Sequence, residues 1–148
     1  MMTTRRIIIS TITTGPDGIR LEAELNDSPT AQKIWEVLPV LERVNRWGDE
    51  VYLSVPVWMG EESDARRDVD VGDLAFWPLG RTLCIFFGPT PVSTDGRPKA
   101  YSPVNIVGRV LSDVSVLKKV EEKTFFIVRP WDPSEDGDTD EATEATNE

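Results

Sequence analysis

The chain has 148 residues, enough for one domain with its own hydrophobic core but too few for two domains of ordinary size. It carries 26 acidic and 16 basic residues, for a net charge of −10, and it contains one cysteine and no histidine. The missing histidine excludes Ser-His and Cys-His nucleophile pairs and argues against a zinc site, and the single cysteine excludes an internal disulfide. We therefore expect no metal and no cofactor.

The negative charge is concentrated at the C-terminal end. Residues 132–148 hold eight acids and no lysine or arginine, so the body has 18 acids against 16 bases, a net charge of −2. Without a basic surface, the body is not expected to bind nucleic acid. The composition predicts a folded domain over 1–131 and a disordered acidic tail over 132–148.

The N-terminal half reads as strands around one helix. The first apolar run, 7–9, is too short for a signal peptide or a membrane span, which predicts a cytoplasmic protein without a membrane partner. Strands are expected over 6–13 and 19–25, with turn-forming residues at 14–18 between them. A helix over 29–38 is predicted by a capping Ser28, by Pro29 and by an apolar stripe that includes Ile34 and Trp35.

Six more strands are expected over 40–47, 50–55, 74–77, 83–87, 105–111 and 123–129, with exposed loops over 59–70 and 94–103 and a short helix over 114–120. The runs 74–77 and 83–87 are short, apolar and bounded by glycine or proline, as in buried strands. The total is eight short strands with no alternating strand–helix pattern. This favours an all-β fold, either a closed barrel or a sandwich.

The same residues resemble a prokaryotic family of cyclophilin-like barrel proteins of unknown function. The resemblance covers residues 5–130 and is carried by the segments 45–52, 71–73, 77–78, 83–88, 90–93 and 104–108 in this order. It implies a closed eight-stranded cyclophilin-like β-barrel capped by a helix. In barrels of this kind the ligand face is the outer wall. The resemblance does not settle activity, because the Phe-His-Arg run of the prolyl isomerases has no counterpart in this sequence.

Candidate site residues follow from strand alternation and from the resemblance. Val51, Leu53 and Val55 share one face of their strand, which would leave Glu50 and Tyr52 on the outer wall. The predicted ligand-binding residues are Trp47, Glu50, Tyr52, Trp77, Arg81, Phe87, Ser93 and Asn105.

Each of these candidates also has a structural interpretation. The aromatic residues could fill the core, Arg81 or Arg46 could be a solvated arginine, and Ser93 and Asn105 could satisfy loop backbone. Glu50 with Asp49 or Asp73 could form an acid–base pair, although both aspartates also fit turns. Cys84 is expected to be buried and unreactive.

Three functions remain open at this stage. The first is binding of a small molecule or a short peptide in an outer-wall groove. The second is peptidyl-prolyl isomerisation, which needs an apolar slot and one hydrogen-bond donor, for example Arg81 or Arg46. The third is a non-catalytic subunit that docks to a partner enzyme. No catalytic residue and no oligomeric state is assigned.

Overall fold

The computed structural model describes residues 5–13 and 15–137 of the chain. The expected turn residue Thr14 and the part of the expected acidic tail over 138–148 lie outside the described residues. The elements in chain order are β1 (Arg5–Thr11), β2 (Arg20–Leu25), α1 (Pro29–Val37), β3 (Val40–Arg43), β4 (Asn45–Arg46), β5 (Glu50–Ser54), β6 (Arg66–Asp68), β7 (Asp73–Trp77), β8 (Thr82–Phe86), β9 (Lys99–Val110), η1 (Val114–Lys119), β10 (Phe125–Pro130) and α2 (Pro133–Asp136).

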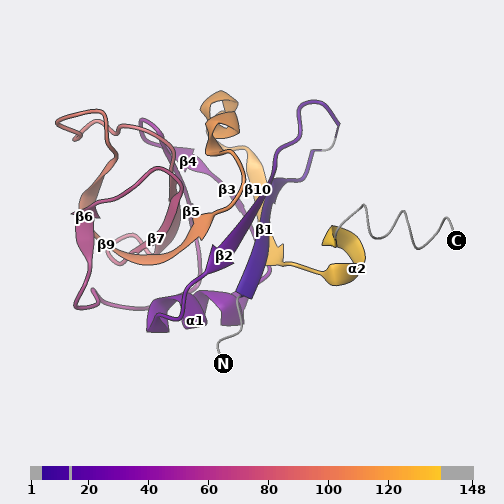
Figure 1. Cartoon of the computed structure of the whole chain (residues 1–148), viewed down its shortest axis with the longest axis horizontal. Helices are drawn as coiled ribbons and strands as arrows, with labels where there is room; N and C mark the ends of the chain where they lie inside the picture. Colours follow the sequence, from indigo (N-terminus) through magenta and orange to yellow (C-terminus); the bar gives the residue numbers. More distant parts are fainter. Residues whose placement is uncertain (1–4, 14, 138–148) are drawn as a thin grey trace, which may run out of the picture.

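The strands pair in the order β3-β10-β1-β2-β9-β7-β8-β5-β4, with β6 attached to β9 (Figure 1). The fold is mostly β, as expected, but the prediction of a closed eight-stranded barrel was wrong. The described residues form ten strands, and the sheet ends at β3 on one side and at β4 on the other.

The chain itself connects these two ends of the sheet. β3 pairs with β10, and Val44 still exchanges hydrogen bonds with Thr124 and Lys123 on that side. The next residue, Asn45, pairs with Tyr52 of β5. The chain thus pairs with the β10 side up to Val44 and with β5 from Asn45 on. The two ends of the sheet, β3 and β4, are connected by this covalent segment and not by a ladder of hydrogen bonds.

The two strands beyond the expected eight are β4 and β6. The expected strand over 40–47 divides at Val44 into β3 and β4. Strand β6 lies inside the expected loop over 59–70, and β9 begins at Lys99, inside the expected loop over 94–103. These two pair with each other, because the first half of β9 turns away from the main sheet and β6 lies against it.

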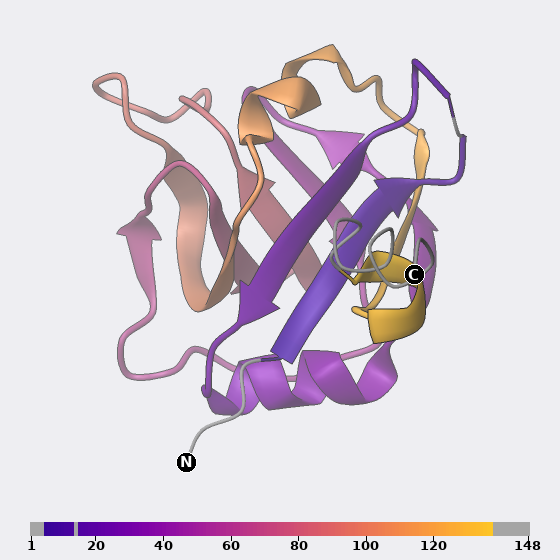
Figure 2. The same cartoon turned by 45° about the vertical axis from the view of Figure 1, so that its right-hand side comes forward.

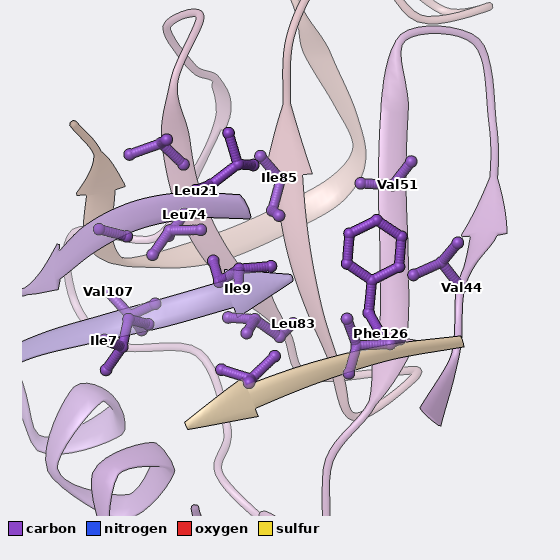
Figure 3. Packing of buried hydrophobic residues seen from close by; sticks show 14 of the residues in the cluster. Ile7, Ile9, Leu21, Val44, Val51, Leu74, Leu83, Ile85, Val107 and Phe126 are labelled. Carbon is purple, nitrogen blue, oxygen red and sulfur yellow. The ribbon is translucent and has the colours of Figure 1, made fainter. Parts of the chain in front are cut away.

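The main core fills the concave side of the sheet. It contains the inward residues expected from alternation, including Val51, Leu53 and Val55, and Figure 3 shows Ile7, Ile9, Leu74, Leu83 and Phe126 packed together there. A second, smaller cluster lies on the outer face. It consists of Val69, Ala75, Cys84, Phe86, Ala100 and Val104. This outer cluster is where β6 and the first half of β9 cover β7 and β8.

Helix α1 lies across one end of the sheet (Figure 2). It begins as predicted, with the Ser28 side chain accepting a hydrogen bond from the Ala31 N–H and Pro29 in the first turn. Its buried face includes Ala31 and Ile34. Within residues 5–13 and 15–137, no helix has both the length and the apolar character that a bilayer span needs.

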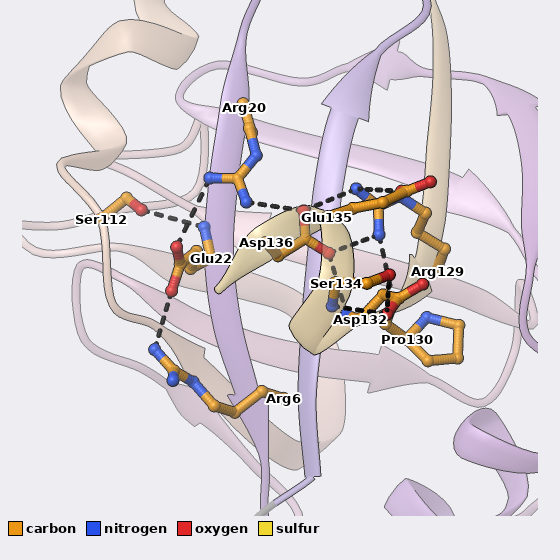
Figure 4. A network of polar contacts seen from close by, with 10 residues as sticks. All are labelled: Arg6, Arg20, Glu22, Ser112, Arg129, Pro130, Asp132, Ser134, Glu135 and Asp136. Atoms are coloured by element: carbon orange, nitrogen blue, oxygen red, sulfur yellow. Dashed lines mark hydrogen bonds and ion pairs between the residues drawn. The ribbon is translucent and has the colours of Figure 1, made fainter. Parts of the chain in front are cut away.

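The start of the expected disordered tail is ordered. Asp136 in α2 accepts two hydrogen bonds from the Arg129 guanidinium, at 2.7 and 2.9 Å, and one from Arg20 at 2.8 Å (Figure 4). Its side chain is only 2% exposed. The bond from Arg129 holds the pKa of Asp136 well below its usual range. The side chains of Arg20 on β2 and Arg129 on β10 therefore both bind the segment that follows residue 131.

We expect Asp136→Asn to destabilise the protein by about 1–2 kcal/mol at pH 7, because it removes charge-assisted hydrogen bonds from two arginines. Because the pKa is lowered in the folded state, this contribution is present above about pH 4 and is lost in acid. Urea unfolding at pH 7 measures it. Glu135→Gln is the matched control, since Glu135 is exposed and lies 3.9 Å from Arg129. Equal stability of the two variants would contradict the prediction.

Candidate functional site

A pocket of about 150 Å³ lies on the outer face of the sheet, between β5, β7 and the first half of β9. It is lined by Trp47, Glu50, Tyr52, Trp77, Ala100, Tyr101 and Val104. Four of these, namely Trp47, Glu50, Tyr52 and Trp77, are among the residues predicted from the sequence. The structure thus brings half of the predicted set together in one concavity.

Strand alternation and one tight turn place the residues of the β5 side. Glu50 and Tyr52 project to the face opposite the main core, since Val51 and Leu53 belong to that core. Trp47 precedes β5 and exchanges backbone hydrogen bonds with Glu50, at 2.9 and 3.2 Å. These bonds close the turn around Gly48, which has a φ of 60°. The turn returns Trp47 to the same face as Glu50.

The other wall is aromatic and firmly held. Trp77 ends β7, and its indole N–H donates a 2.6 Å hydrogen bond to the Ser102 hydroxyl. Its ring packs directly against Gly80, where a Cβ atom would lie 2.4 Å from the indole. Tyr101 on β9 meets Trp77 edge to face at 6.0 Å and Trp47 at 6.1 Å, measured between ring centroids. These three rings therefore form a continuous wall around the pocket.

Glu50 supplies the only carboxyl group of the pocket lining, and it is 7% exposed. Burial raises the pKa of Glu50 to about 7, and the neighbouring Cys84 thiol opposes part of that rise. Within the part of the chain that the structure describes, no lysine or arginine forms an ion pair with it. Glu50 is thus a buried acid that has no ion-pair partner among the described residues and whose pKa is shifted toward neutral pH.

The groups around Glu50 respond to its charge. Burial raises the pKa of Tyr52, and the negative charge of Glu50 adds to the rise, followed by smaller effects of Cys84 and Glu122. Cys84 is fully buried behind the pocket, and burial raises the pKa of its thiol well above the usual value. The predicted burial of Cys84 is confirmed, and the raised pKa favours the protonated form of the thiol. Among the lining residues, Glu50 is the one that carries charge near neutral pH.

Comparison with protein families gives one match. The model of the family described as cyclophilin-like matches residues 10–129. The chain belongs to the cyclophilin-like family. The resemblance proposed from the sequence is confirmed.

A solved structure supports the cyclophilin-like assignment. A hypothetical protein from the archaeon Archaeoglobus fulgidus, determined in solution, is similar, with a TM-score of 0.72 and 32% sequence identity. The match covers 86% of this chain and 95% of the archaeal chain. A search of curated proteins found no match. The comparisons therefore fix family and fold but name no ligand.

Two of the predicted residues of this cyclophilin-like chain lie away from the pocket. Arg81 sits in the β7–β8 turn with a φ of 53°, and its guanidinium lies over the Trp58 ring at 5.0 Å. Phe87 belongs to the main core, and the Arg46 guanidinium covers its ring at 5.1 Å. Arg46 also donates to the backbone carbonyls of Lys118 and Val120, so it fastens η1 to the β4–β5 turn.

The side chains of Ser93 and Asn105 form hydrogen bonds with other parts of the chain. The Ser93 hydroxyl accepts from the Thr90 N–H at 2.9 Å and donates to the Arg97 carbonyl at 2.6 Å. The Asn105 side chain is 1% exposed and connects three segments. It donates to the Thr30 hydroxyl and the Gly60 carbonyl and accepts from the Glu62 N–H. Both residues follow the structural interpretation that the sequence left open.

Neither aspartate forms an acid–base pair with Glu50. Asp49 is held by Arg46, with 3.2 Å between Nη2 and Oδ1, and packs on Gly88. Asp73 accepts a backbone hydrogen bond from Asp70 at 2.9 Å, and neither aspartate belongs to the pocket lining. Both satisfy turns, and Glu50 is the acid left to act in the pocket.

We expect Asn105→Ala to lower the free energy of unfolding by about 2 kcal/mol, because three hydrogen bonds are lost and two backbone groups lose their partner. Thermal and urea unfolding measure the change. Asn45→Ala is the matched control, since the Asn45 side chain accepts one exposed bond from Lys123 and its loss is expected to have little effect. A stability loss at Asn105 no larger than at Asn45 would show that Asn105 does not tie these segments together.

Sequence reasoning missed the β9 side of the pocket. Tyr101, Ala100 and Val104 fell in or beside the segment expected to be a loop, because Gly96, Pro98 and Pro103 indicate irregular backbone. The one available signal was Tyr101 itself, an aromatic residue in a polar segment. It is 63% exposed, which identifies it as the outermost ring of the pocket.

Proposed function

We propose that this cyclophilin-like protein is a binding protein whose site is the aromatic pocket around Glu50, and that the ligand is a small molecule or a side chain of a short peptide. The observation that carries the proposal is the convergence of three aromatic rings and one unpaired buried carboxyl in a concavity. Sites for small ligands combine apolar walls with a few placed polar groups. Burial of a carboxyl without an ion-pair partner lowers the stability of the fold, and such carboxyl groups are typical of functional sites.

Prolyl isomerisation has less support from this geometry. It requires a hydrogen-bond donor beside the apolar slot, and the two arginines considered for that role, Arg46 and Arg81, contact Phe87 and Trp58 instead of lining the pocket. The one charged group that the pocket presents is an acid, and neither arginine considered as the donor belongs to its lining. The third possibility is docking to a partner enzyme, in which an exposed surface and not the pocket would form the contact.

An NMR titration tests the proposal. A set of small amines, acids, amides and an X-Pro peptide is added to ¹⁵N-labelled protein, and amide shifts are recorded together with cis–trans exchange of the peptide. We expect saturable shifts centred on Glu50, Tyr52 and Tyr101. We expect Tyr101→Ala to weaken binding at least tenfold without loss of fold, because Tyr101 is mostly exposed.

Trp58→Ala is the control for that variant, since Trp58 is 67% exposed and does not line the pocket. Binding that is equally weakened in Trp58→Ala and Tyr101→Ala, or shifts that cluster away from the pocket, would overturn the proposed site. Protein-dependent exchange of the X-Pro peptide would favour the isomerase instead.

A further inference from the structure

The chemical character of the pocket limits what it can bind. Its walls are the rings of Trp47, Trp77, Tyr101 and Tyr52, and the one charged group of its lining is the Glu50 carboxyl. Aromatic faces carry negative electrostatic potential and attract cations, most strongly those of tryptophan. A carboxylate next to such rings adds a full negative charge. Both components of the lining therefore favour a positive ligand group and disfavour an anion.

The charged neighbours do not supply that positive group. The titratable side chains next to Glu50 are the Cys84 thiol on β8 and the Tyr52 phenol on β5, and the Tyr101 phenol on β9 belongs to the same lining. On β6, the exposed Arg67 donates a 3.1 Å hydrogen bond to the carbonyl of Ala100, which also lines the pocket, and among the described residues it forms no ion pair with Glu50. Arg46, the nearest arginine in sequence, is bound to Asp49 and to η1 carbonyls. Glu122 adds negative charge near Tyr52. Within the described protein no cation is paired with Glu50, so when the carboxyl is ionised a positive ligand group would supply the missing countercharge.

The pocket size fits an alkylammonium group. An engineered apolar cavity of about 150 Å³ holds a benzene molecule, and the present pocket has about 150 Å³. A methylated ammonium group is of comparable bulk and is less strongly hydrated than a bare ammonium or a metal ion, so it loses less hydration free energy on leaving water. A compact hydrated metal ion would instead need several oxygen ligands, and the lining provides one carboxyl group.

We propose that the pocket binds an organic cation, an alkyl- or methylammonium group held between the Trp47, Trp77 and Tyr101 rings with its charge against Glu50. This inference rests on the proposed function and specifies the ligand class of the same site. The group could belong to a free amine or to the side chain of a lysine in a peptide. The shared chemistry is the ammonium centre surrounded by aromatic carbon.

Calorimetry with matched probes tests the inference. The probes are choline, its neutral carbon isostere 3,3-dimethylbutan-1-ol, and a capped tripeptide with a central trimethyllysine. We expect choline to bind at least tenfold more tightly than the isostere at pH 8. We also expect choline binding to weaken as the pH falls from 8 to 6, as Glu50 takes up a proton. Tighter binding of the tripeptide than of choline would identify a peptide side chain as the source.

Glu50→Gln is the decisive variant, because it keeps the shape of the side chain and removes the charge. We expect it to lose the preference for choline while binding of the isostere is unchanged. Equal binding of choline and the isostere by the wild type would overturn the cation assignment but leave the pocket as a ligand site. Absence of binding by all three probes would also overturn the assignment. The proposed function itself would fail only if the wider set of fragments and the X-Pro peptide also left the pocket unperturbed.

Discussion

Glu50→Gln is expected to stabilise the ligand-free protein by about 3 kcal/mol at pH 8 and by about 1 kcal/mol or less at pH 5. The pKa of Glu50 is raised from 4.5 to about 7 by burial. The folded state therefore holds the proton more tightly than the unfolded state. Wild-type stability is highest below about pH 4.5, falls as the pH rises to 7 and is level above that. Glutamine removes this loss because it carries no charge to desolvate.

Urea unfolding of both proteins from pH 5 to pH 8 measures the effect. Glu42→Gln, on the exposed part of β3, is the matched control and is expected to show no such dependence. A difference between Glu50→Gln and wild type that does not grow with pH would show that Glu50 is not a desolvated acid. The gain in stability and the expected loss of cation binding in the same variant would identify Glu50 as a residue retained for binding.

Gly108→Ala is expected to destabilise the protein by about 3 kcal/mol or more, the upper range for overpacking a rigid site. A Cβ atom at this position would lie 2.1 Å from the carbonyl oxygen of Glu24 and 3.0 Å from the Cα atom of Leu25. Both are backbone atoms of β2, so relief requires separating β2 from β9. Gly108 also sits beside the irregularity in the β7–β9 ladder, where Leu74 pairs with Gly108 and Ala75 pairs with Ile106.

Gly96→Ala is the control, because no atom lies within 4 Å of a Cβ placed there. Thermal and urea unfolding of the two variants are compared, and choline binding is measured wherever the variant folds. We expect loss of stability and weaker choline binding only for Gly108→Ala. The irregularity beside Gly108 in the β7–β9 ladder lies next to the first half of β9, which contributes to the pocket wall. Equal stability of both variants would contradict the close strand approach.

The elements that could be predicted from sequence were those with local signals. The α1 start depends on Ser28 and Pro29, and the outward direction of Tyr52 depends on the alternation of Val51, Leu53 and Val55, so both were predictable. The central strands β7 and β8 were equally clear. Glu50 was placed in the candidate set by the same alternation, but its lack of a countercharge is a property of the three-dimensional packing.

The missed features depend on contacts distant in sequence. β6 is highly polar and becomes a strand only because β9 offers it an edge. Asn105 was predicted to bind a ligand, but its side chain forms hydrogen bonds with Thr30, Gly60 and Glu62, which are distant in sequence. The break between β3 and β4 arises because Val44 keeps its bonds to the β10 side. None of these pairings leaves a periodic signal in the chain.

The most direct test of the account is the titration of the Glu50 carboxyl itself. Its side-chain carboxyl carbon is followed by ¹³C NMR from pH 3 to pH 9, with and without saturating choline, using Glu50→Gln to assign the signal. We expect a midpoint near 7 in the free protein, because burial raises the pKa of Glu50, and a lower midpoint with choline bound, since the cation stabilises the carboxylate. A midpoint near the ordinary value of 4.5, unchanged by choline, would contradict it.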